Sequence, residues 1–219
     1  RELSGGSRLP RLREFASLLF NRRFMVVTGL AAVPAKILLT GMCFYLVPLF
    51  LLSIDSTQAV AGRVLMTYGV VMVLASPLAA RLATTRRRME WFVGSGLLVS
   101  VAGGLRLLIG THVIWVFAVV LMVGLGQALS MAAQRALIRE HCEREIALLG
   151  EPAVYGVYRL LERLGNAFGP IIAALLVVAV GYRSSFVVTG AAVLTCGLAF
   201  ILLTIASQTR ELRVARGVA

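Results

Sequence analysis

The stretch FMVVTGLAAVPAKILLTGMCFYLVPLFLL, residues 24–52, is the most informative part of the sequence, because it is apolar throughout except for one charged residue, Lys36. About 20 apolar residues form a helix that crosses the hydrocarbon core of a membrane, so this stretch is long enough to span it. Lys36 lies about 18 Å along such a helix from Phe24, at 1.5 Å per residue. Its side chain reaches only about 6 Å towards the membrane surface. We therefore expect Lys36 to face a bundle interior, since a charge at this depth costs at least ~2.5 to 3.5 kcal/mol.

Five further apolar stretches have the length of a membrane span. The chain is 59% hydrophobic and only 15% charged, whereas a soluble domain has about 25% charged residues. A lipid-facing backbone must satisfy its own hydrogen bonds, and the alternating strands of a membrane barrel are absent from the sequence. The sequence therefore predicts an all-α polytopic membrane protein with six transmembrane helices, at residues 24–52, 64–82, 91–109, 113–133, 154–180 and 186–206.

Arginine residues mark the expected orientation. They cluster before the first span, between the second and third, after the fourth and after the last, whereas the opposite loops hold little more than Arg63 and Arg183. By the positive-inside rule these clusters are cytoplasmic, so we expect both termini in the cytoplasm of a bacterium and the bundle in its inner membrane. The net charge of +12 does not indicate nucleic-acid binding, because the sequence has no continuous basic face with interleaved aromatic residues.

Three segments are expected along the chain: a cytoplasmic linker or amphipathic segment at 1–23, the transmembrane bundle at 24–206 and a cytoplasmic tail at 207–219. The linker has too short an apolar run to span, so we expect it to lie along the inner face of the membrane. The chain opens at Arg1 rather than at a methionine. We therefore expect it to be part of a longer protein.

The expected helices repeat along the sequence. Their starts near residues 24, 62 and 91 are followed by starts near 113, 154 and 186. Because each set has three spans, an odd number, the second set crosses the membrane in the opposite sense. This is the inverted-repeat organisation of many secondary transporters.

The fifth span brings several polar groups into the membrane, in the sequence YGVYRLLERLGNAFGP at 155–170. Its apolar remainder is too short to cross alone. One face of the helix carries Tyr155, Arg159, Glu162, Arg163 and Asn166. Glu162 can pair with Lys36 across the bundle, or locally with its neighbouring arginines. Either this stripe lines the cytoplasmic half of a solute cavity, with Glu162 coupling transport to protons, or it is a structural charge cluster at the inner mouth.

The candidate pathway for solute and ions consists of Lys36, Gln127, Arg159, Glu162, Arg163 and Asn166. Gln127 lies about two thirds of the way along the fourth span, where it could contact either a solute or a neighbouring helix. Gln134 is nearer the cytoplasmic end, so we expect it at the membrane interface.

Small residues and prolines indicate how the helices pack. Gly165 and Gly169 form a G-x-x-x-G pattern, and Ser100 with Gly104 forms a second small-residue pair, so we expect close helix contacts at both. Pro34 and Pro48 bracket the half of the first span that carries the lysine. We therefore expect that helix to be broken and to line a cavity.

No pattern in the sequence indicates an enzyme, a metal site or a bound cofactor. The cysteines are scattered, and His112 and His141 lie in expected loops without a set of ligands around them. The phosphate-binding pattern G-x-x-x-x-G-K-[ST] is absent, so we do not expect ATP-driven transport by this chain alone.

The segment YGVVMVLASPLAARLATTRRRMEW, at 68–91, resembles the sequence that follows the second helix of each half of major facilitator superfamily transporters. The family pattern is roughly Gly-x-Leu-Ala-Asp-Arg-x-Gly-Arg-Arg. Leu78, Ala79 and Arg81 fit it, whereas Ala80 and Ala83 replace its Asp and its second Gly. Together with the short outer loops, this resemblance implies the C-terminal six-helix half of such a transporter, built as 3+3 inverted repeats.

The resemblance also implies a function. The chain would move a small-molecule solute by alternating access, rocking against a second six-helix bundle supplied by the preceding part of the same chain, with Lys36 as an anion or counter-ion site. Its partners would be the lipid bilayer, that bundle and the solute. Two alternatives remain open: a membrane-embedded sensory or anchoring domain attached to a soluble signalling or ligand-binding module, and a half-size transporter that acts as a homodimer.

Overall fold

The computed structural model describes residues 18–82, 91, 93–99 and 112–215, with side chains described as far as residue 206. Every regular element in these ranges is a helix. Four helices are long and apolar enough to cross a membrane, namely Arg22–Ser53, Gln58–Leu82, Val113–His141 and Glu151–Ala206. The prediction of an all-α membrane protein is therefore confirmed. Most of the expected span 91–109 lies outside the described residues, so the count of six spans stays a prediction.

The first span is one continuous helix whose hydrogen-bonding pattern changes along its length. In chain order it consists of α2 (Arg22–Val27), η1 (Thr28–Ala32), α3 (Val33–Ile37), η2 (Leu38–Leu46) and α4 (Val47–Ser53), where η denotes a π-helix. The side chain of Asn21 accepts hydrogen bonds from two backbone N–H groups of the first turn. Its amide also donates to Glu145 at 2.7 Å, which ties the start of this span to another helix.

Pro34 and Pro48 account for the two π-helical segments, since each lies in the first turn of the α-helix that follows a π-helix. A proline ring clashes with the carbonyl group four residues earlier. Those two carbonyl groups lie inside η1 and η2, where the wider turn accommodates the ring. The expectation of a broken helix is wrong, because the backbone keeps right-handed helical angles at the junctions of these segments. The helix widens at the prolines instead of unwinding.

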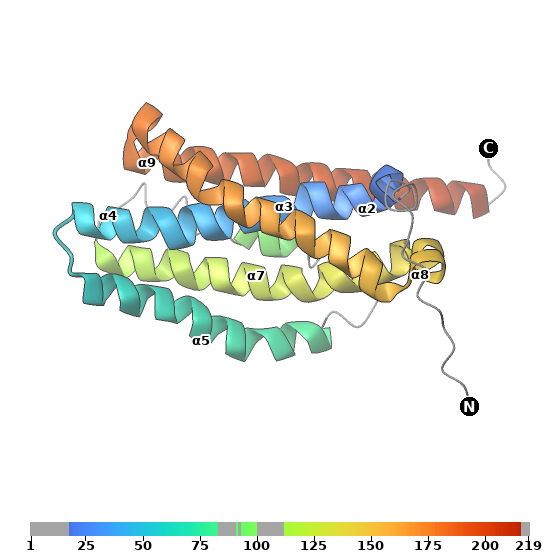
Figure 1. Ribbon diagram of the computed structural model, residues 1–219, viewed down its shortest axis with the longest axis horizontal. Helices are drawn as coiled ribbons and strands as arrows, with labels where there is room; N and C mark the ends of the chain where they lie inside the picture. Colours follow the sequence, from blue (N-terminus) through green and yellow to red (C-terminus); the bar gives the residue numbers. More distant parts are fainter. Residues whose placement is uncertain (1–17, 83–90, 92, 100–111, 216–219) are drawn as a thin grey trace.

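Two further spans lie beside each other below the first one in Figure 1. They are α5 (Gln58–Leu82) and α7 (Val113–His141), and the short α8 (Glu143–Leu149) follows α7 at a corner. Many apolar side chains of α5 are exposed, among them Val70, Val73, Leu74 and Leu78. An apolar exposed surface of this kind is what lipid requires of a spanning helix.

The last helix, α9 (Glu151–Ala215), contains both the fifth and the sixth expected spans. Its two arms, 151–180 and 182–215, meet at Gly181, where φ is 78° and ψ is 170°. Glycine adopts these angles without the clash that a Cβ atom causes, and the chain reverses direction at this point (Figure 1). The second arm continues past residue 206, where the sequence predicted the end of the bundle.

The helix ends fall into two groups (Figure 1). The start of α2 and the ends of α5, α7 and α9 lie at one end of the bundle, whereas the α4–α5 connection and the reversal of α9 lie at the other. Among the described residues, the first helix therefore starts at the end of the bundle where the last helix ends.

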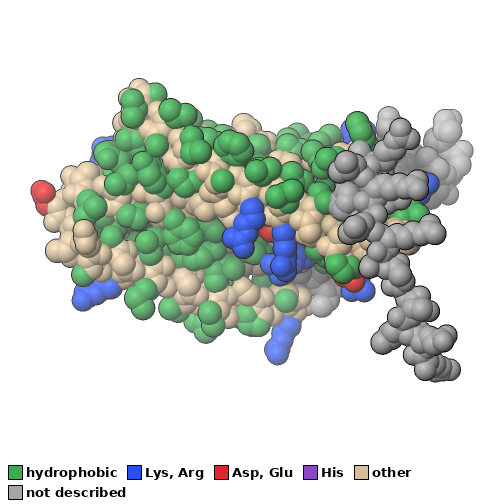
Figure 2. Space-filling model, in the orientation of Figure 1, with side chains coloured by type: hydrophobic (Ala, Val, Ile, Leu, Met, Phe, Trp, Pro, Cys, Tyr) green, Lys and Arg blue, Asp and Glu red, His purple; other side chains and the backbone are tan. Residues whose placement is uncertain are grey.

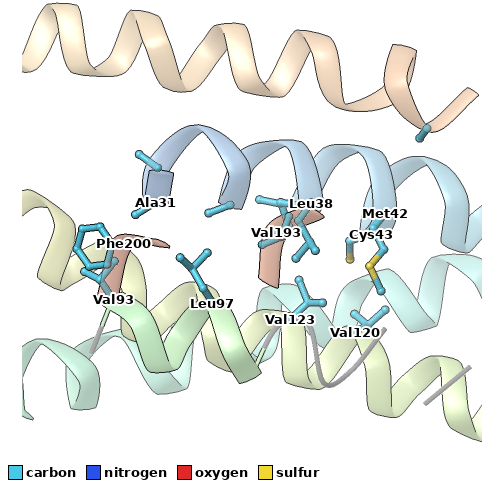
Figure 3. Close-up of a cluster of buried hydrophobic side chains, with 14 of the residues drawn as sticks. Ala31, Leu38, Met42, Cys43, Val93, Leu97, Val120, Val123, Val193 and Phe200 are labelled. Atoms are coloured by element: carbon cyan, nitrogen blue, oxygen red, sulfur yellow. The ribbon is translucent and has the colours of Figure 1, made fainter. Parts of the chain in front are cut away.

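The first span lies at the centre of the packing. Figure 3 shows its side chains meeting those of α7, of the second arm of α9 and of the helical residues 93–99. The buried side chains labelled there are Ala31, Leu38, Met42, Cys43, Val93, Leu97, Val120, Val123, Val193 and Phe200. The first span thus contacts helices on several sides, and this central position removes Lys36 from lipid.

Candidate functional site

Two glycines let the first arm of α9 approach the first span closely. A Cβ atom added at Gly165 would lie 2.9 Å from the Val33 carbonyl oxygen and 3.1 Å from the Lys36 Cβ. One added at Gly169 would lie 2.9 Å from the Gly41 amide nitrogen. The two backbones are therefore in contact, as the G-x-x-x-G pattern predicted. The other predicted pair, Ser100 and Gly104, lies outside the described residues.

This contact brings Lys36 of α3 next to Glu162 of α9. The Lys36 Nζ lies 3.5 Å from the Glu162 Oε1, and it donates to the Met131 Sδ of α7 at 3.6 Å. Both charged residues are buried, each with 8% of its surface exposed. The Lys36 ammonium thus lies between α7 and α9. Of the two pairings considered for Glu162 from the sequence, the pairing across the bundle is the one present.

A hydrogen-bonded network extends from this ion pair into α7. The Tyr158 hydroxyl lies 3.3 Å from the Glu162 Oε1 and 3.0 Å from the Gln134 Oε1. The Gln134 amide nitrogen donates to the Ser130 hydroxyl at 2.6 Å, which leaves its carbonyl oxygen towards the tyrosine. Because a hydroxyl has one hydrogen, Tyr158 can donate to only one of its two neighbours at a time.

Sequence reasoning did not assign Gln134 to this network and overlooked two other members, Tyr158 and Ser130. Gln134 is only 1% exposed, so its side chain lies inside the bundle, and its expected depth near the membrane interface stays a prediction. Tyr158 was overlooked, although it precedes Glu162 by four residues and therefore shares its helix face. That spacing is the signal that could have found it.

The predicted polar stripe of α9 divides into an inner and an outer part. Glu162 is buried, whereas Arg159 and Arg163 are exposed and make no ion pair with a described carboxylate. Asn166 is half-buried, and its Oδ1 atom is buried without a hydrogen-bond partner. Figure 2 shows basic side chains over the first arm of α9, with acidic atoms between them. The two arginines therefore lie near Glu162 along α9 but on the exposed surface of that helix.

Gln127 lies in the interior, 1% exposed. Its amide nitrogen donates to the Ala35 carbonyl oxygen at 2.7 Å, next to the lysine on the first span. The Gln127 Oε1 is buried without a partner. Of the two contacts considered for this residue, the one with a neighbouring helix is present. Its free oxygen still lacks a hydrogen-bond donor.

Two observations concern metal and thiol chemistry in the described part of the chain. No three His, Cys, Asp or Glu side chains there gather as a metal ion requires. At the α7–α8 corner, burial and the nearby Glu145 carboxylate raise the pKa of the Cys142 thiol to about 12. A thiol with that pKa stays protonated at neutral pH and is a poor nucleophile.

Comparison with known proteins identifies the family. Residues 12–217 match the sequence profile described as Major Facilitator Superfamily. No curated protein and no solved structure matches the chain significantly. The family match covers almost the whole chain and agrees with the long apolar helices, with the small-residue helix contact and with the resemblance of the segment 68–91. The chain therefore belongs to the major facilitator superfamily of membrane transport proteins.

Proposed function

We propose that this chain is one half of a secondary active transporter, which moves a small solute by alternating access against a second six-helix bundle. Membership of a transporter family supports this proposal. Transporters of this family are built from two such halves, each with three-helix inverted repeats. The preceding part of the same polypeptide would supply the second bundle, and the basic helix ends would face the cytoplasm from the inner membrane of a bacterium.

The observation that carries the proposal is the buried ion pair between Lys36 and Glu162. A buried pair adds little stability compared with apolar residues of the same size, because removing both charges from water is costly. Ionisable groups in membrane spans therefore mark solute and ion pathways by default. Glu162 of this pair also lies near Arg159 and Arg163 along α9, and both arginines are exposed.

Each residue of the candidate pathway has a proposed role. Lys36 and Glu162 form the exchangeable pair, with Glu162 taking up a proton when it loses its partner. Arg159 and Arg163 line the inner mouth. The buried oxygen atoms of Gln127 and Asn166, which have no donor, accept hydrogen bonds from the solute. Each of the six residues of the candidate pathway thus has a role in the proposal.

Solute accumulation tests the proposal. The reading frame that contains this chain is expressed in bacterial cells, and the small molecules inside and outside them are compared by mass spectrometry with those of a Lys36→Leu variant. We expect at least one solute whose distribution changes with the unaltered protein and not with the variant. The matched control, Arg183→Leu, also removes one exposed basic residue, but beside the reversal of α9 at Gly181 and away from the ion pair, and it should behave as the unaltered protein does.

One result would contradict the proposal. If no solute distinguishes Lys36→Leu from the unaltered protein while both reach the membrane in equal amounts, the chain does not act as a transporter through this site. A changed output from an attached soluble domain, without any solute flux, would instead favour the sensory alternative.

A further inference from the structure

We propose that the transported solute is an anion, and that one of its negatively charged oxygens replaces Glu162 as the partner of Lys36. This inference rests on the proposed function and adds the chemical class of the solute to it. It starts from the partners of the Lys36 ammonium, which carries three hydrogen-bond donors.

The Lys36 ammonium is poorly matched by the groups around it. Among the described side chains its partners are the Glu162 Oε1 at 3.5 Å and the Met131 Sδ at 3.6 Å. Hydrogen bonds between an ammonium and a carboxylate are normally about 2.7–2.9 Å long, and a thioether sulfur is a weak acceptor. The buried cation therefore lacks a close oxygen atom. A solute that supplies one gains a charge-assisted hydrogen bond that the protein itself does not make.

Glu162 is better satisfied than the lysine. Its Oε1 atom has both the Lys36 ammonium and the Tyr158 hydroxyl within reach, at 3.5 Å and 3.3 Å. Beside the ion pair, the carboxylate thus has a hydroxyl donor that it shares with Gln134, whereas the cation has only a thioether sulfur. This asymmetry favours a negatively charged solute over a positively charged one.

The surroundings of the pair carry an excess of positive charge. Arg159 and Arg163 are exposed on α9, on either side of Glu162 in sequence. Arg135 is exposed on α7, and its carbonyl oxygen accepts a hydrogen bond from the Tyr155 hydroxyl of α9 at 2.9 Å. Clustered charge of one sign attracts solutes of the opposite sign. The three exposed arginines therefore favour anions over cations at this side of the bundle.

Exchange of partners at Lys36 also moves a proton. When an oxygen of the anion bonds to the ammonium, Glu162 loses its counter-ion, and a buried carboxylate without a partner takes up a proton rather than remain charged. The proton comes from water at the mouth and forms the O–H bond of Glu162. The Tyr158 hydroxyl is then free to donate to Gln134 instead. One negative charge and one proton enter together, so a monoanion leaves the net charge of the site unchanged.

Ligand-induced stabilisation of the purified protein, measured at constant ionic strength, tests the inference. The probes are sodium acetate, lactate, succinate and phosphate, with glycerol and glucose as neutral solutes and choline chloride as a cation. We expect stabilisation by at least one anion and by none of the others. Lys36→Gln should weaken that binding about thirtyfold or more, the effect of truncating one partner of a buried charged contact. Arg183→Gln, which removes a charge beside the reversal of α9 at Gly181 and away from the ion pair, should leave it unchanged.

A second variant separates exchange from simple attraction. Glu162→Gln removes the internal competitor for Lys36, so the anion should bind about fivefold more tightly, since the net free energy of a buried ion pair is small. The same variant should abolish the proton uptake that a pH indicator records when the anion binds to the unaltered protein in weak buffer. Removing a nearby negative charge also tightens anion binding by simple attraction, so the loss of proton uptake is the result that identifies exchange.

Three other outcomes would overturn the inference that the solute is an anion bound by Lys36. Anion binding that survives in Lys36→Gln, or in the double variant Lys36→Gln with Glu162→Gln if the single one does not fold, overturns the inference, and so does the absence of stabilisation by all four anions. Binding of a neutral or cationic probe that depends on Lys36 overturns the inference but leaves the transporter proposal standing. Only the absence of any Lys36-dependent solute flux in cells removes both.

Discussion

Two helix contacts in this bundle are both made through glycine, yet they differ in what they hold together. The first arm of α9 meets the first span through Gly165 and Gly169, and the atoms opposite these glycines belong mainly to the backbone. α5 meets α7 through Gly124, and the atoms opposite it belong to the side chains of Val71 and Tyr68. Of these two contacts, the one with α9 contains the buried ion pair.

The difference shows how far the helices at each contact can shift relative to each other. Lipid is as apolar as a leucine side chain, so burying apolar surface between spans gains little, and close packing with polar contacts holds helices together. Two backbones in contact cannot shift independently, which fixes the spacing between Lys36 and Glu162. A contact made through side chains can repack when the helices move. The α9 contact therefore behaves as a fixed support for the ion pair, and the α5 contact as an adaptable one.

The largest expected effect comes from separating the charges of the α9 contact. Lys36→Leu leaves Glu162 buried without its partner, which costs about 3–5 kcal/mol of the free energy of unfolding. The double variant Lys36→Leu with Glu162→Leu removes both charges, so most of that loss should be recovered. Denaturant unfolding of the unaltered protein, both single variants and the double variant in one detergent measures these free energies as a double-mutant cycle.

Two results would show that the pair is not a buried, coupled unit. One is additive losses in the double variant. The other is a loss in the single variants as small as that of an exposed salt bridge, which is about 1 kcal/mol or less.

A smaller effect is expected from the glycines that support the pair. Gly169→Val places a branched side chain against the Gly41 amide and the Ile37 carbonyl, which are backbone groups that cannot rotate away. Such overpacking typically costs about 1–3 kcal/mol and pushes the helices apart. A thermal unfolding series in detergent checks the loss. Gly69→Val is the matched control, because nothing lies within 4 Å of a Cβ atom at that position of α5.

If the two valine variants lose equal stability, the α9 backbones are not in the tight contact described above. A drop in solute accumulation for Gly169→Val, at equal protein level, would further indicate that the spacing between Lys36 and Glu162 matters for transport.

Much of this fold could be predicted from apolar run lengths, because a membrane core sets the length of a spanning helix. The spans 24–52, 64–82 and 113–133 all fall within long apolar helices of the structure. The way in which these helices pack was harder to predict from the sequence. The π-helical segments around Pro34 and Pro48 depend on how the preceding turn of the same helix accommodates a proline ring. The sequence alone predicted a break there.

Part of the candidate site could also be predicted from the position of residues along the apolar spans. Depth in the membrane required a partner for Lys36, and Glu162 was among the residues available to it. The stripe of α9 did not behave as a unit, because Gly165 and Gly169 turn one edge of it inward and leave Arg159 and Arg163 exposed at the other. Spacing along one helix gives the residues that share a face, but only the packed neighbour determines how much of that face is buried.

The smallest expected effect belongs to the α5 contact. In Gly124→Ala the new Cβ atom would lie 3.0 Å from the Val71 Cγ1 and 3.1 Å from the Val71 Cβ, close enough to require a small shift of that valine. Alanine also favours the helix by about 1 kcal/mol over glycine. These terms oppose each other, so the change in the free energy of unfolding should be near zero, within about 0.5 kcal/mol. Gly169→Ala gains the same helix propensity but faces the Thr40 hydroxyl and two backbone groups, the Gly41 amide and the Ile37 carbonyl, so it should lose stability. Equal results for the two alanine variants, measured by the same unfolding assay, would mean that both contacts adapt and that the ion pair is supported in some other way.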